Sequence, residues 1–564
     1  MLEHLLYWSD KRLLYFFISY GGALVLFLMA IWPIFRHGGI GSHKASGIFL
    51  ILLGLWMVAS RWPGLFYFLP FDPDEAQIVA AAQTLGTQPV LYRMADGASA
   101  GPLVIYGAGL PWIFGSVPSL VVARLIAVLY AWAGVAAIYI GIRATGAELA
   151  ARLGALAAAL FYGLNGFWNF VHYNSEMLPS VLCAWSTALL VSLFCINRVN
   201  GSRRWEWRAY LAAVLLSMVP FAKLQLVPLA LCIGLLIYGR GVWMHSGKWT
   251  QTLRYTGMLA LSVLIFPAAF FLFIYFGGGF DYFFHSYILN NLLYASSGYS
   301  SRFNVAWQLL KTGDEMILWG GGVVIATSMI LLFDLLAGAG KSGPRRIIAL
   351  ICISLAGVAA YCVLAPSRDY IHYLLLLPLP MAFALGAVVA WMEESEVKAL
   401  RHRAVLLIAP AVLILALLPY LFVKVKPNNS WAGSAYSWSH KPWTGVAAEL
   451  LKRSKSPSEG LLVWGYVPEL NVTTGILQAS RLSITSAQIQ QNALTPFYRK
   501  SLMEDLSAHP PRFIVDAVCK EGFIFTDGDL YGPKCFPEFN QMLTTSYQLV
   551  GDFTGMKLYE RIIR

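Results

Sequence analysis

Repeated apolar runs are the feature that most constrains how this chain can fold. Each run is about 20 residues long, which is enough for an α-helix to cross the ~30 Å hydrocarbon core of a bilayer. Of the 564 residues, 58% are hydrophobic and only 12% are charged. This composition excludes a soluble enzyme and a nucleic-acid-binding protein, and it predicts a polytopic α-helical membrane protein.

The apolar runs predict about 11–12 transmembrane helices. They lie near residues 13–34, 46–61, 119–142, 150–170, 177–197, 207–222, 224–239, 254–277, 316–338, 345–364, 370–392 and 403–423. The first run has no small-x-small cleavage pattern and is too long for the core of a signal peptide. It is therefore expected to remain as an anchor helix.

Basic residues are distributed unequally between the two sides of these helices. The loops on one side are rich in Arg and Lys, including Arg143, Arg152, Arg240, Arg345 and Arg346. The loops on the other side hold few: Arg61, Arg93, Lys223, Arg302, Lys311 and Arg368. By the positive-inside rule the basic side faces the cytoplasm. The long loops 62–118 and 278–315, and everything after residue 424, are then expected outside.

The composition becomes that of a soluble domain from about Lys424 onward. Periodicity there predicts two helices, two buried strands and a hairpin: Pro442–Lys455, Pro496–Ala508, Leu461–Trp464, Phe513–Val518, and Tyr547–Phe553 with Lys557–Arg561. The expected organisation is an anchor helix with a cytoplasmic loop (1–45), a transmembrane domain (46–423) and a C-terminal extracytoplasmic α/β domain (424–564).

Seven cysteines, an odd and small number, offer no disulfide framework. Five lie inside predicted spans, where they serve as small apolar side chains. Cys519 and Cys535 lie in the outer domain, in a compartment where disulfides persist. Two interpretations stay open there, a disulfide between them or two free buried thiols.

Three carboxylates stand together at the start of the first outer loop, in Phe71-Asp72-Pro73-Asp74-Glu75-Ala76. Asp72 suits the N-cap of a helix, Pro73 its first position, and Glu75 the third position, from which a carboxylate reaches back to the cap. Capping leaves Asp74 unused, and the helix dipole favours its ionised form, which can accept a proton. From these residues alone, capping and catalysis are equally well supported.

The helix that follows is expected to run to Gly86. Its apolar residues recur at helical spacing, at Ile78, Val79, Ala82 and Leu85. This pattern predicts a helix lying along the membrane surface with its acidic N-terminus at the lipid–water boundary.

Several short motifs accompany this acid pair. They are Ala100-Gly101-Pro102-Leu103, His172-Tyr173-Asn174-Ser175-Glu176, Arg368-x-x-x-His372-Tyr373 followed by Leu377-Pro378-Leu379-Pro380, and Val463-Trp464-Gly465-Tyr466-Val467-Pro468-Glu469-Leu470 followed by Ala479-Ser480-Arg481. In order and sidedness they resemble the GT-C glycosyltransferases, especially the bacterial branch related to protein mannosyltransferases and lipid A aminoarabinose transferases. The resemblance covers roughly residues 46 to 561.

The resemblance implies an inverting transfer of a sugar from a polyprenyl-phosphate carrier to an extracytoplasmic lipid, glycan or protein. It implies that Asp74 is the catalytic base, that Glu75 orients the acceptor, and that Glu176 contacts the acceptor or a divalent ion. It also implies a pocket for donor or acceptor. The residues expected to line that pocket are Asp72, His172, Tyr173, His372 and Tyr373.

The departing phosphate needs cations. Arg368 is the first candidate, and Arg93, Lys223 and Arg302 are the others, because basic residues are scarce in the outer loops. Snorkelling of these side chains to lipid phosphates is the alternative for each.

Cofactors are expected to be limited to a divalent cation, Mg²⁺ or Mn²⁺, held by Asp74, Glu75 and Glu176, with metal dependence left open. No P-loop and no strand-linked Gly-x-Gly-x-x-Gly occurs, so no nucleotide is expected. The aromatic segment from Gly277 to Tyr299 suits either a mobile flap over the site or an interfacial aromatic belt.

Other classes of function remain as alternatives. A flippase or secondary transporter would place ionisable residues at mid-membrane and often shows repeated halves. An O-antigen polymerase or ligase would share lipid-linked substrates, and a non-catalytic subunit would have lost the acid pair. The expected location is a bacterial inner membrane, with the site and the C-terminal domain on the periplasmic side.

Overall fold

The computed structural model describes residues 17–35, 43–67, 69–165, 168–170, 172–196, 205–298, 300–312, 314–336, 343–394 and 442–562. The chain divides into two compact units. The first consists of Met1–Phe66, Leu125–Ala269 and Tyr294–Gly433, and the second of Tyr67–Arg124, Phe270–Leu293 and Ser434–Arg564. The first outer loop therefore groups with the C-terminal domain, whereas the sequence assigned it to the transmembrane domain.

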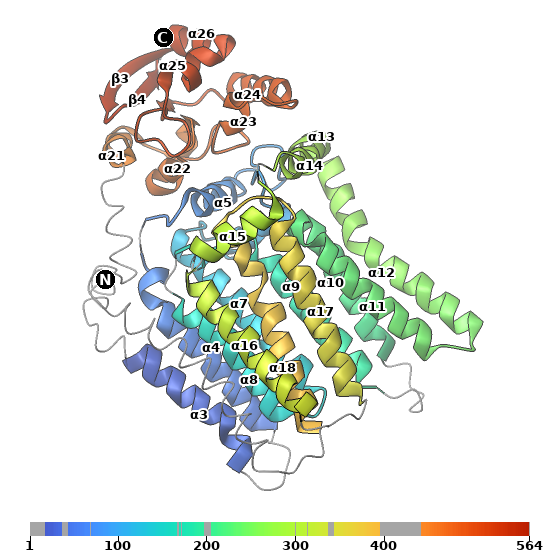
Figure 1. The fold of residues 1–564 in the computed structure, drawn as a ribbon. Coiled ribbons are helices and arrows are strands. Elements are labelled where there is room, and N and C mark those ends of the chain that lie inside the picture. The colour runs from blue at the N-terminus through green and yellow to red at the C-terminus, as the bar shows by residue number, and fades with distance from the viewer. Residues whose placement is uncertain are drawn as a thin grey trace. The chain divides into compact units, whose positions relative to one another are not determined.

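The first unit is a bundle of α-helices (Figure 1). Its elements are α3 (Gly22–Phe35), α4 (His43–Leu65), α7 (Leu120–Arg143, beginning in the second unit), α8 (Glu148–Leu164), α9 (Met177–Phe194), α10 (Glu206–Ala222), α11 (Val227–Met244), α12 (Trp249–Phe276, ending in the second unit), α15 (Arg302–Thr312), α16 (Asp314–Leu336), α17 (Pro344–Leu364) and α18 (Pro378–Glu394). Glycines allow close packing of α8 on α18. A Cβ on Gly154 would lie 3.1 Å from the carbonyl oxygen of Ala382 and 3.2 Å from the Cα of Gly386.

Six of the described helical segments are long and apolar enough to span a membrane. They are Leu120–Arg143, Met177–Phe194, Leu224–Met244, Trp249–Phe276, Pro344–Leu364 and Ile371–Glu393. Helices also form at the spans predicted near 150–170, 207–222 and 316–338. The predicted polytopic helical architecture is thus confirmed, and the span predicted at 403–423 lies outside the described residues.

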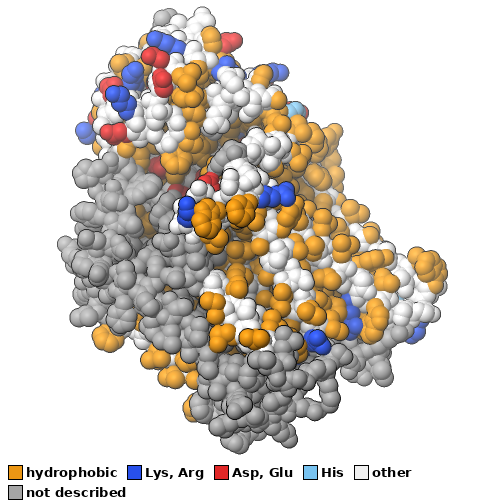
Figure 2. Space-filling model, in the orientation of Figure 1, with side chains coloured by type: hydrophobic (Ala, Val, Ile, Leu, Met, Phe, Trp, Pro, Cys, Tyr) orange, Lys and Arg blue, Asp and Glu red, His pale blue; other side chains and the backbone are white. Residues whose placement is uncertain are grey.

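Exposed apolar side chains follow α12 along its length. They include Leu253, Leu261, Leu264, Ile265, Leu272 and Phe276, and Figure 2 shows this apolar cover. Such a surface suits the acyl chains of a bilayer. Charged side chains gather instead on the C-terminal domain (Figure 2).

The second unit contains the outer-loop helices and the C-terminal α/β domain. The outer-loop elements are α5 (Pro73–Thr84), α6 (Pro102–Ala108), α13 (Phe280–Phe283) and the π-helical turn Phe284–Leu289. Nearly every residue of α5 is buried, its apolar and polar positions alike. The predicted helix is therefore present and ends two residues before Gly86, but it is covered by protein rather than lying with one face on a membrane.

The C-terminal domain is built on a four-stranded sheet in the order β1-β2-β4-β3. Its strands are β1 (Leu461–Trp464), β2 (Phe513–Asp516), β3 (Tyr547–Phe553) and β4 (Met556–Arg561). β1 and β2 are parallel, and β4 is antiparallel to both β2 and β3. Thr554 and Gly555 both have positive φ, as a two-residue hairpin turn of type I′ requires. The predicted strands and hairpin are confirmed.

Both faces of β1 and β2 are buried. Leu461 and Val463 belong to the core cluster that includes residues of α21 (Trp443–Arg453) and α22 (Glu469–Thr474). Leu462 and Trp464 belong to a cluster that includes residues of α24 (Thr495–Ala508) and α26 (Pro537–Ser546). This alternation explains why β1 and β2 are continuous apolar runs in the sequence.

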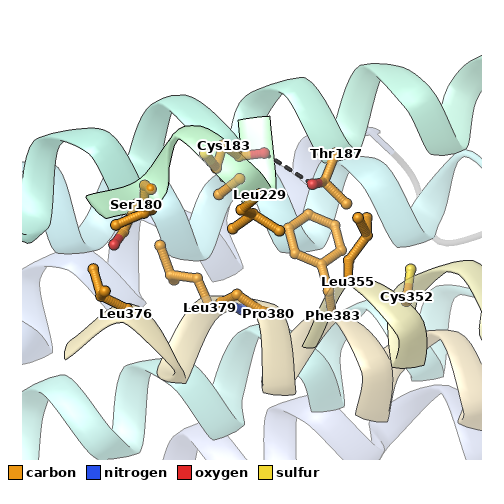
Figure 3. A pocket seen from close by; sticks show the side chains of 12 residues that line it. Ser180, Cys183, Thr187, Leu229, Cys352, Leu355, Leu376, Leu379, Pro380 and Phe383 are labelled. Atoms are coloured by element: carbon orange, nitrogen blue, oxygen red, sulfur yellow. Dashed lines mark hydrogen bonds between the residues drawn. The ribbon is translucent and has the colours of Figure 1, made fainter. Parts of the chain in front are cut away.

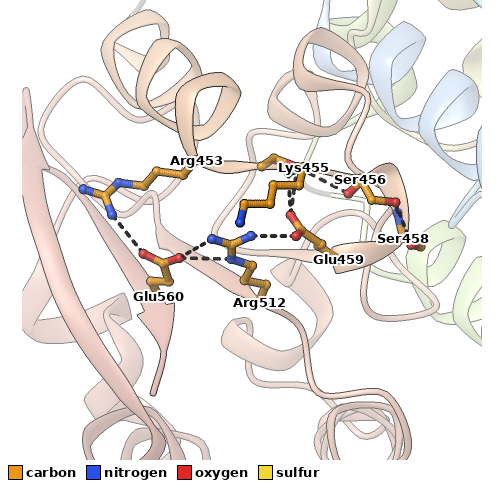
Figure 4. Close-up of polar contacts among 8 residues, drawn as sticks. Arg453, Lys455, Ser456, Ser458, Glu459, Arg512 and Glu560 are labelled. Atoms are coloured by element: carbon orange, nitrogen blue, oxygen red, sulfur yellow. Dashed lines mark hydrogen bonds and ion pairs between the residues drawn. The ribbon is translucent and has the colours of Figure 1, made fainter. Parts of the chain in front are cut away.

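An ion-pair network joins α21 to the sheet (Figure 4). Glu560 lies between Arg453, at 2.9 Å, and Arg512, at 2.8 Å, and Arg512 also pairs with Glu459 at 2.6 Å. Partly exposed pairs of this kind stabilise a domain modestly.

The two outer cysteines are free thiols, so the disulfide interpretation does not hold. Cys519 is buried, and Cys535 is half-buried with its Sγ 3.8 Å from the carbonyl oxygen of Tyr531. Burial raises the pKa of both thiols, which disfavours the thiolate needed for oxidation.

Candidate active site

The N-terminus of α5 is fixed by the first of its three acids. Asp72 has extended backbone (φ −149°, ψ 170°), and its Oδ1 accepts a 2.8 Å hydrogen bond from the N–H of Glu75. Pro73 follows at the first helical position, where its missing N–H leaves no bond unmade. The predicted cap is confirmed. Because Asp72 is only 4% exposed and serves as this cap, it does not line an open pocket.

Glu75 forms a closed ion pair with Arg124. The guanidinium donates from Nε to Oε1 and from Nη2 to Oε2, both at 2.7 Å, and both side chains are fully buried. Oε2 also accepts from the N–H of Phe71 at 2.9 Å, not from the N-cap residue as a capping box would require. Other N–H groups of Arg124 donate to the carbonyls of Tyr67 and Leu69. Glu75 therefore holds the loop together, and its predicted role in orienting an acceptor does not fit this geometry.

Asp74 differs from its two acidic neighbours because it is partly exposed. The hydroxyl of Tyr466 donates to its Oδ1 at 3.3 Å. Gln77 lies one turn further along the same helix face, and its buried Nε2 has no partner among the described residues. A carboxylate at a helix N-terminus is favoured in its ionised form. Of the three acids at this helix start, Asp74 is the one suited to accept a proton from a ligand.

A second buried carboxylate lies in the first unit, where α9 begins. Glu176 is fully buried, and its Oε1 lies 2.7 Å from Nζ of Lys223 and 4.0 Å from Nε2 of His372. Ser175 donates to the other carboxylate oxygen at 2.9 Å and accepts from Lys223 at 2.7 Å. Burial opposes ionisation, but Lys223 and His372 outweigh it, so the pKa of Glu176 is below its usual value. Glu176 is therefore held as an anion between basic side chains.

Aromatic rings connect this carboxylate to Arg368. Nζ of Lys223 lies 5.6 Å from the ring centroid of Tyr373, whose hydroxyl is 3.4 Å from that of Tyr294. The guanidinium of Arg368 stacks on Tyr294 with Cζ 3.7 Å from the ring centroid, and it donates to Ser297 at 3.1 Å. The predicted residues in this neighbourhood are Glu176, Lys223, Arg368, His372 and Tyr373.

The remaining predicted residues are placed differently. Arg302 is exposed on α15, with its Cζ 5.4 Å from the centroid of an aromatic ring of α17. Arg93 is exposed, and its carbonyl accepts a 3.3 Å bond from Nε of Arg481. His172 and Tyr173 are fully buried, and Nδ1 of His172 lies 3.0 Å from the carbonyl oxygen of Tyr173. These two are packed residues rather than the walls of an open pocket.

An apolar cavity begins one helical turn from the Glu176 cluster (Figure 3). It lies among α9, α17, α18 and the start of α11, and its free space is about enough for one water molecule. Its residues Ser180, Leu226 and Leu376 follow the three polar side chains of the cluster by three or four positions each. Leu379 and Phe383 from α18 add apolar surface, as Figure 3 shows. The cavity is lined mostly by apolar side chains.

A divalent metal does not fit the predicted ligand set. Two of its three members, Glu75 and Glu176, each have a cationic partner at 2.7 Å. Across the described part of the chain, no group of three or more His, Cys, Asp or Glu side chains is arranged to hold a metal ion.

Asp96 is a buried acid that sequence reasoning missed. It accepts hydrogen bonds from Ser286 and, at 3.0 Å, from the N–H of Ala98, and Tyr498 donates to Ser286 at 3.2 Å. Burial raises the pKa of Asp96 to about 7, although these bonds and Arg481 act in the opposite direction. The aromatic segment that carries Ser286 is thus tied to the C-terminal domain by polar contacts that a mobile flap would have to break.

Two solved structures align with almost the whole chain. ArnT from Cupriavidus metallidurans, solved bound to undecaprenyl phosphate, has 13% sequence identity and a TM-score of 0.57, over 93% of this chain and 99% of that chain. The Archaeoglobus fulgidus oligosaccharyltransferase, solved with Zn and sulfate, has 12% identity and a TM-score of 0.46, over 91% of this chain and 73% of that chain. No known family model and no curated protein sequence matches. The similarity to ArnT confirms the GT-C fold expected from the sequence.

Proposed function

We propose that this protein is a membrane glycosyltransferase that moves a sugar from a polyprenyl-phosphate carrier to an acceptor hydroxyl at the outer face of a bacterial inner membrane. The observation that carries the proposal is the state of Asp74. Its two acidic neighbours are used by a cap and an ion pair, and Asp74 alone of the three is partly exposed. The fold shared with ArnT, which was solved bound to undecaprenyl phosphate, supports the choice of donor.

In the proposed reaction the protein forms no covalent bond to the sugar. Asp74 accepts the proton of the acceptor hydroxyl, whose oxygen forms a new bond to the anomeric carbon as the bond from that carbon to the phosphate oxygen breaks. The polyprenyl phosphate leaves with the bonding electron pair. Attack from the face opposite to the leaving phosphate inverts the anomeric centre.

The Glu176 neighbourhood supplies the groups that a phosphate needs. Lys223 and Arg368 bring positive charge, and the ring and hydroxyl of Tyr373 lie between them. Glu176 keeps Lys223 in place and also limits how strongly it attracts an anion. Arg368 is the cation best suited to a phosphate, because guanidinium can donate to two oxygens at once.

The test is transfer by the purified full-length protein in lipid nanodiscs. Synthetic undecaprenyl-phosphate monosaccharides carrying glucose, mannose, galactose or aminoarabinose are offered beside the matching nucleotide sugars. The readout is release of undecaprenyl phosphate from the lipid-linked donors and release of nucleotide from the nucleotide sugars. Turnover of at least one lipid-linked donor and of no nucleotide sugar is expected. Turnover of nucleotide sugars alone would remove the proposed donor class.

A further inference from the structure

Tyr466 is presented by a loop of the C-terminal domain whose backbone is fixed from both sides. Gly465, directly after β1, has φ +125°, a conformation that other residues rarely adopt. Its N–H donates to Oγ1 of Thr485 at 2.7 Å, and its carbonyl accepts from the N–H of Thr485 at 3.0 Å. The direction in which Tyr466 leaves the sheet is therefore set by the fold of the domain.

The same loop faces the acidic start of α5. α22, which begins at Glu469 directly after the loop, packs against α5, and Leu69 packs on the core of the C-terminal domain. The charged groups that act most strongly on the Tyr466 hydroxyl are Asp74 in α5, its N-cap Asp72, and Glu469 in α22. Burial, followed by these three negative charges, raises the pKa of Tyr466 well above its usual value. Its hydroxyl remains protonated and able to donate across the working pH range.

We infer that Tyr466 is a positioning residue for Asp74, so that the C-terminal domain completes the base site instead of being a separate module. This inference rests on the proposed function, because it assumes that Asp74 accepts the acceptor's proton. A phenol that donates to Oδ1 fixes the rotation of the carboxylate. It also favours the ionised carboxylate, which is the form that can act as a base.

The test compares Tyr466→Phe with Tyr547→Phe in the full-length protein. Tyr547 belongs to the same domain, is 5% exposed, and donates to the carbonyl of Pro511 at 2.8 Å, so its variant also loses one buried tyrosine hydroxyl bond. Transfer is measured with the undecaprenyl-phosphate sugar that the wild-type protein turns over best, from pH 5 to pH 9. Thermal melting of both variants serves as the folding control.

Tyr466→Phe is expected to lower kcat about tenfold, as expected for loss of one hydrogen bond to a charged group, with KM for the donor unchanged. The acid limb of its rate profile should move to higher pH, because the ionised carboxylate loses a donor. Tyr547→Phe should leave kcat and the pH profile unchanged. In an Asp74→Asn background, Tyr466→Phe should cause no further loss.

Three results would overturn the inference. They are wild-type kcat with an unmoved pH profile in Tyr466→Phe, an equal loss in Tyr547→Phe, and an added loss in the Asp74→Asn background. In each of these, the proposed function stands if Asp74→Asn is inactive. Full activity of Asp74→Asn would remove the base assignment itself, and the inference with it.

Discussion

Glu75 and Glu176 are two buried carboxylates whose negative charges are neutralised in different ways. Each lies at the start of a helix and has one cationic partner at 2.7 Å. Arg124 donates hydrogen bonds to both carboxylate oxygens of Glu75, and both side chains are fully buried. Lys223 contacts Glu176 through a single ammonium group, beside a histidine whose side chain is 16% exposed. The Glu75 pair is enclosed and stabilises a loop, whereas the Glu176 pair lies beside the partly exposed His372, where it can also contact a ligand.

Removing Arg124 should have the largest effect on stability. Arg124→Met leaves the buried charge of Glu75 without a partner, and such a loss is worth about 3–5 kcal/mol of folding free energy. The measurement is thermal unfolding of the detergent-solubilised protein. Glu75→Gln combined with Arg124→Met should recover part of the stability and, with it, transfer activity. Recovery of stability without activity would give Glu75 a catalytic role and break the contrast.

Removing Lys223 should lower the folding stability less than removing Arg124 does, but it should lower transfer activity more. Lys223→Met also leaves a buried carboxylate, but Ser175 and His372 remain near it, so a loss of about 2–3 kcal/mol is expected. Adding Glu176→Gln should restore most of the melting temperature. Transfer should stay reduced by tenfold or more, because the phosphate site has lost a cation. Full activity in this double variant would make the Glu176 pair as purely structural as the Glu75 pair.

A smaller effect is expected at Asp96, where a change of pH alters the charge of the buried carboxyl group. Its folded-state pKa of about 7 lies above the ordinary value of 3.8, so the folded state holds a proton that the unfolded state has lost. Its contribution to stability is complete below about pH 4 and is lost as pH rises toward 7. The wild type should therefore lose on the order of 2 kcal/mol of unfolding free energy, relative to Asp96→Asn, as pH rises from 5 to 8. Asp281→Asn, at an exposed acid of the neighbouring turn, is the control, and the wild type should show no such loss relative to it.

The sequence predicts local structure well here because local structure depends on neighbouring residues. Asp72 and Pro73 correctly predict where α5 begins. The strand Leu461–Trp464 has the predicted bounds. The pairings could not be predicted in this way. Arg124 lies 49 residues from Glu75 within an apolar run that looks like any transmembrane helix, and Ser286 lies 190 residues from Asp96. The tertiary fold determines that Glu75 is buried in an ion pair and that Asp74 is partly exposed.

The same distinction applies to the contacts of the predicted site residues. Glu75 suits an acid pair in sequence, and its buried ion pair with Arg124 depends on a residue far away in the chain. Lys223 was expected to meet phosphate directly, yet it is first a partner of Glu176. Tyr466 was recognised as part of a motif but not as a neighbour of Asp74, because the two are 392 residues apart.

The most direct test of this account is the rate of sugar release from the best undecaprenyl-phosphate donor by Asp74→Asn protein in nanodiscs. The substitution keeps the shape of a side chain that is not the helix cap, so wild-type melting behaviour is expected. Loss of a general base predicts a rate lower by about 10²–10⁴-fold with the donor still bound. A folded Asp74→Asn protein that turns over at the wild-type rate would contradict the assignment of Asp74 as the base.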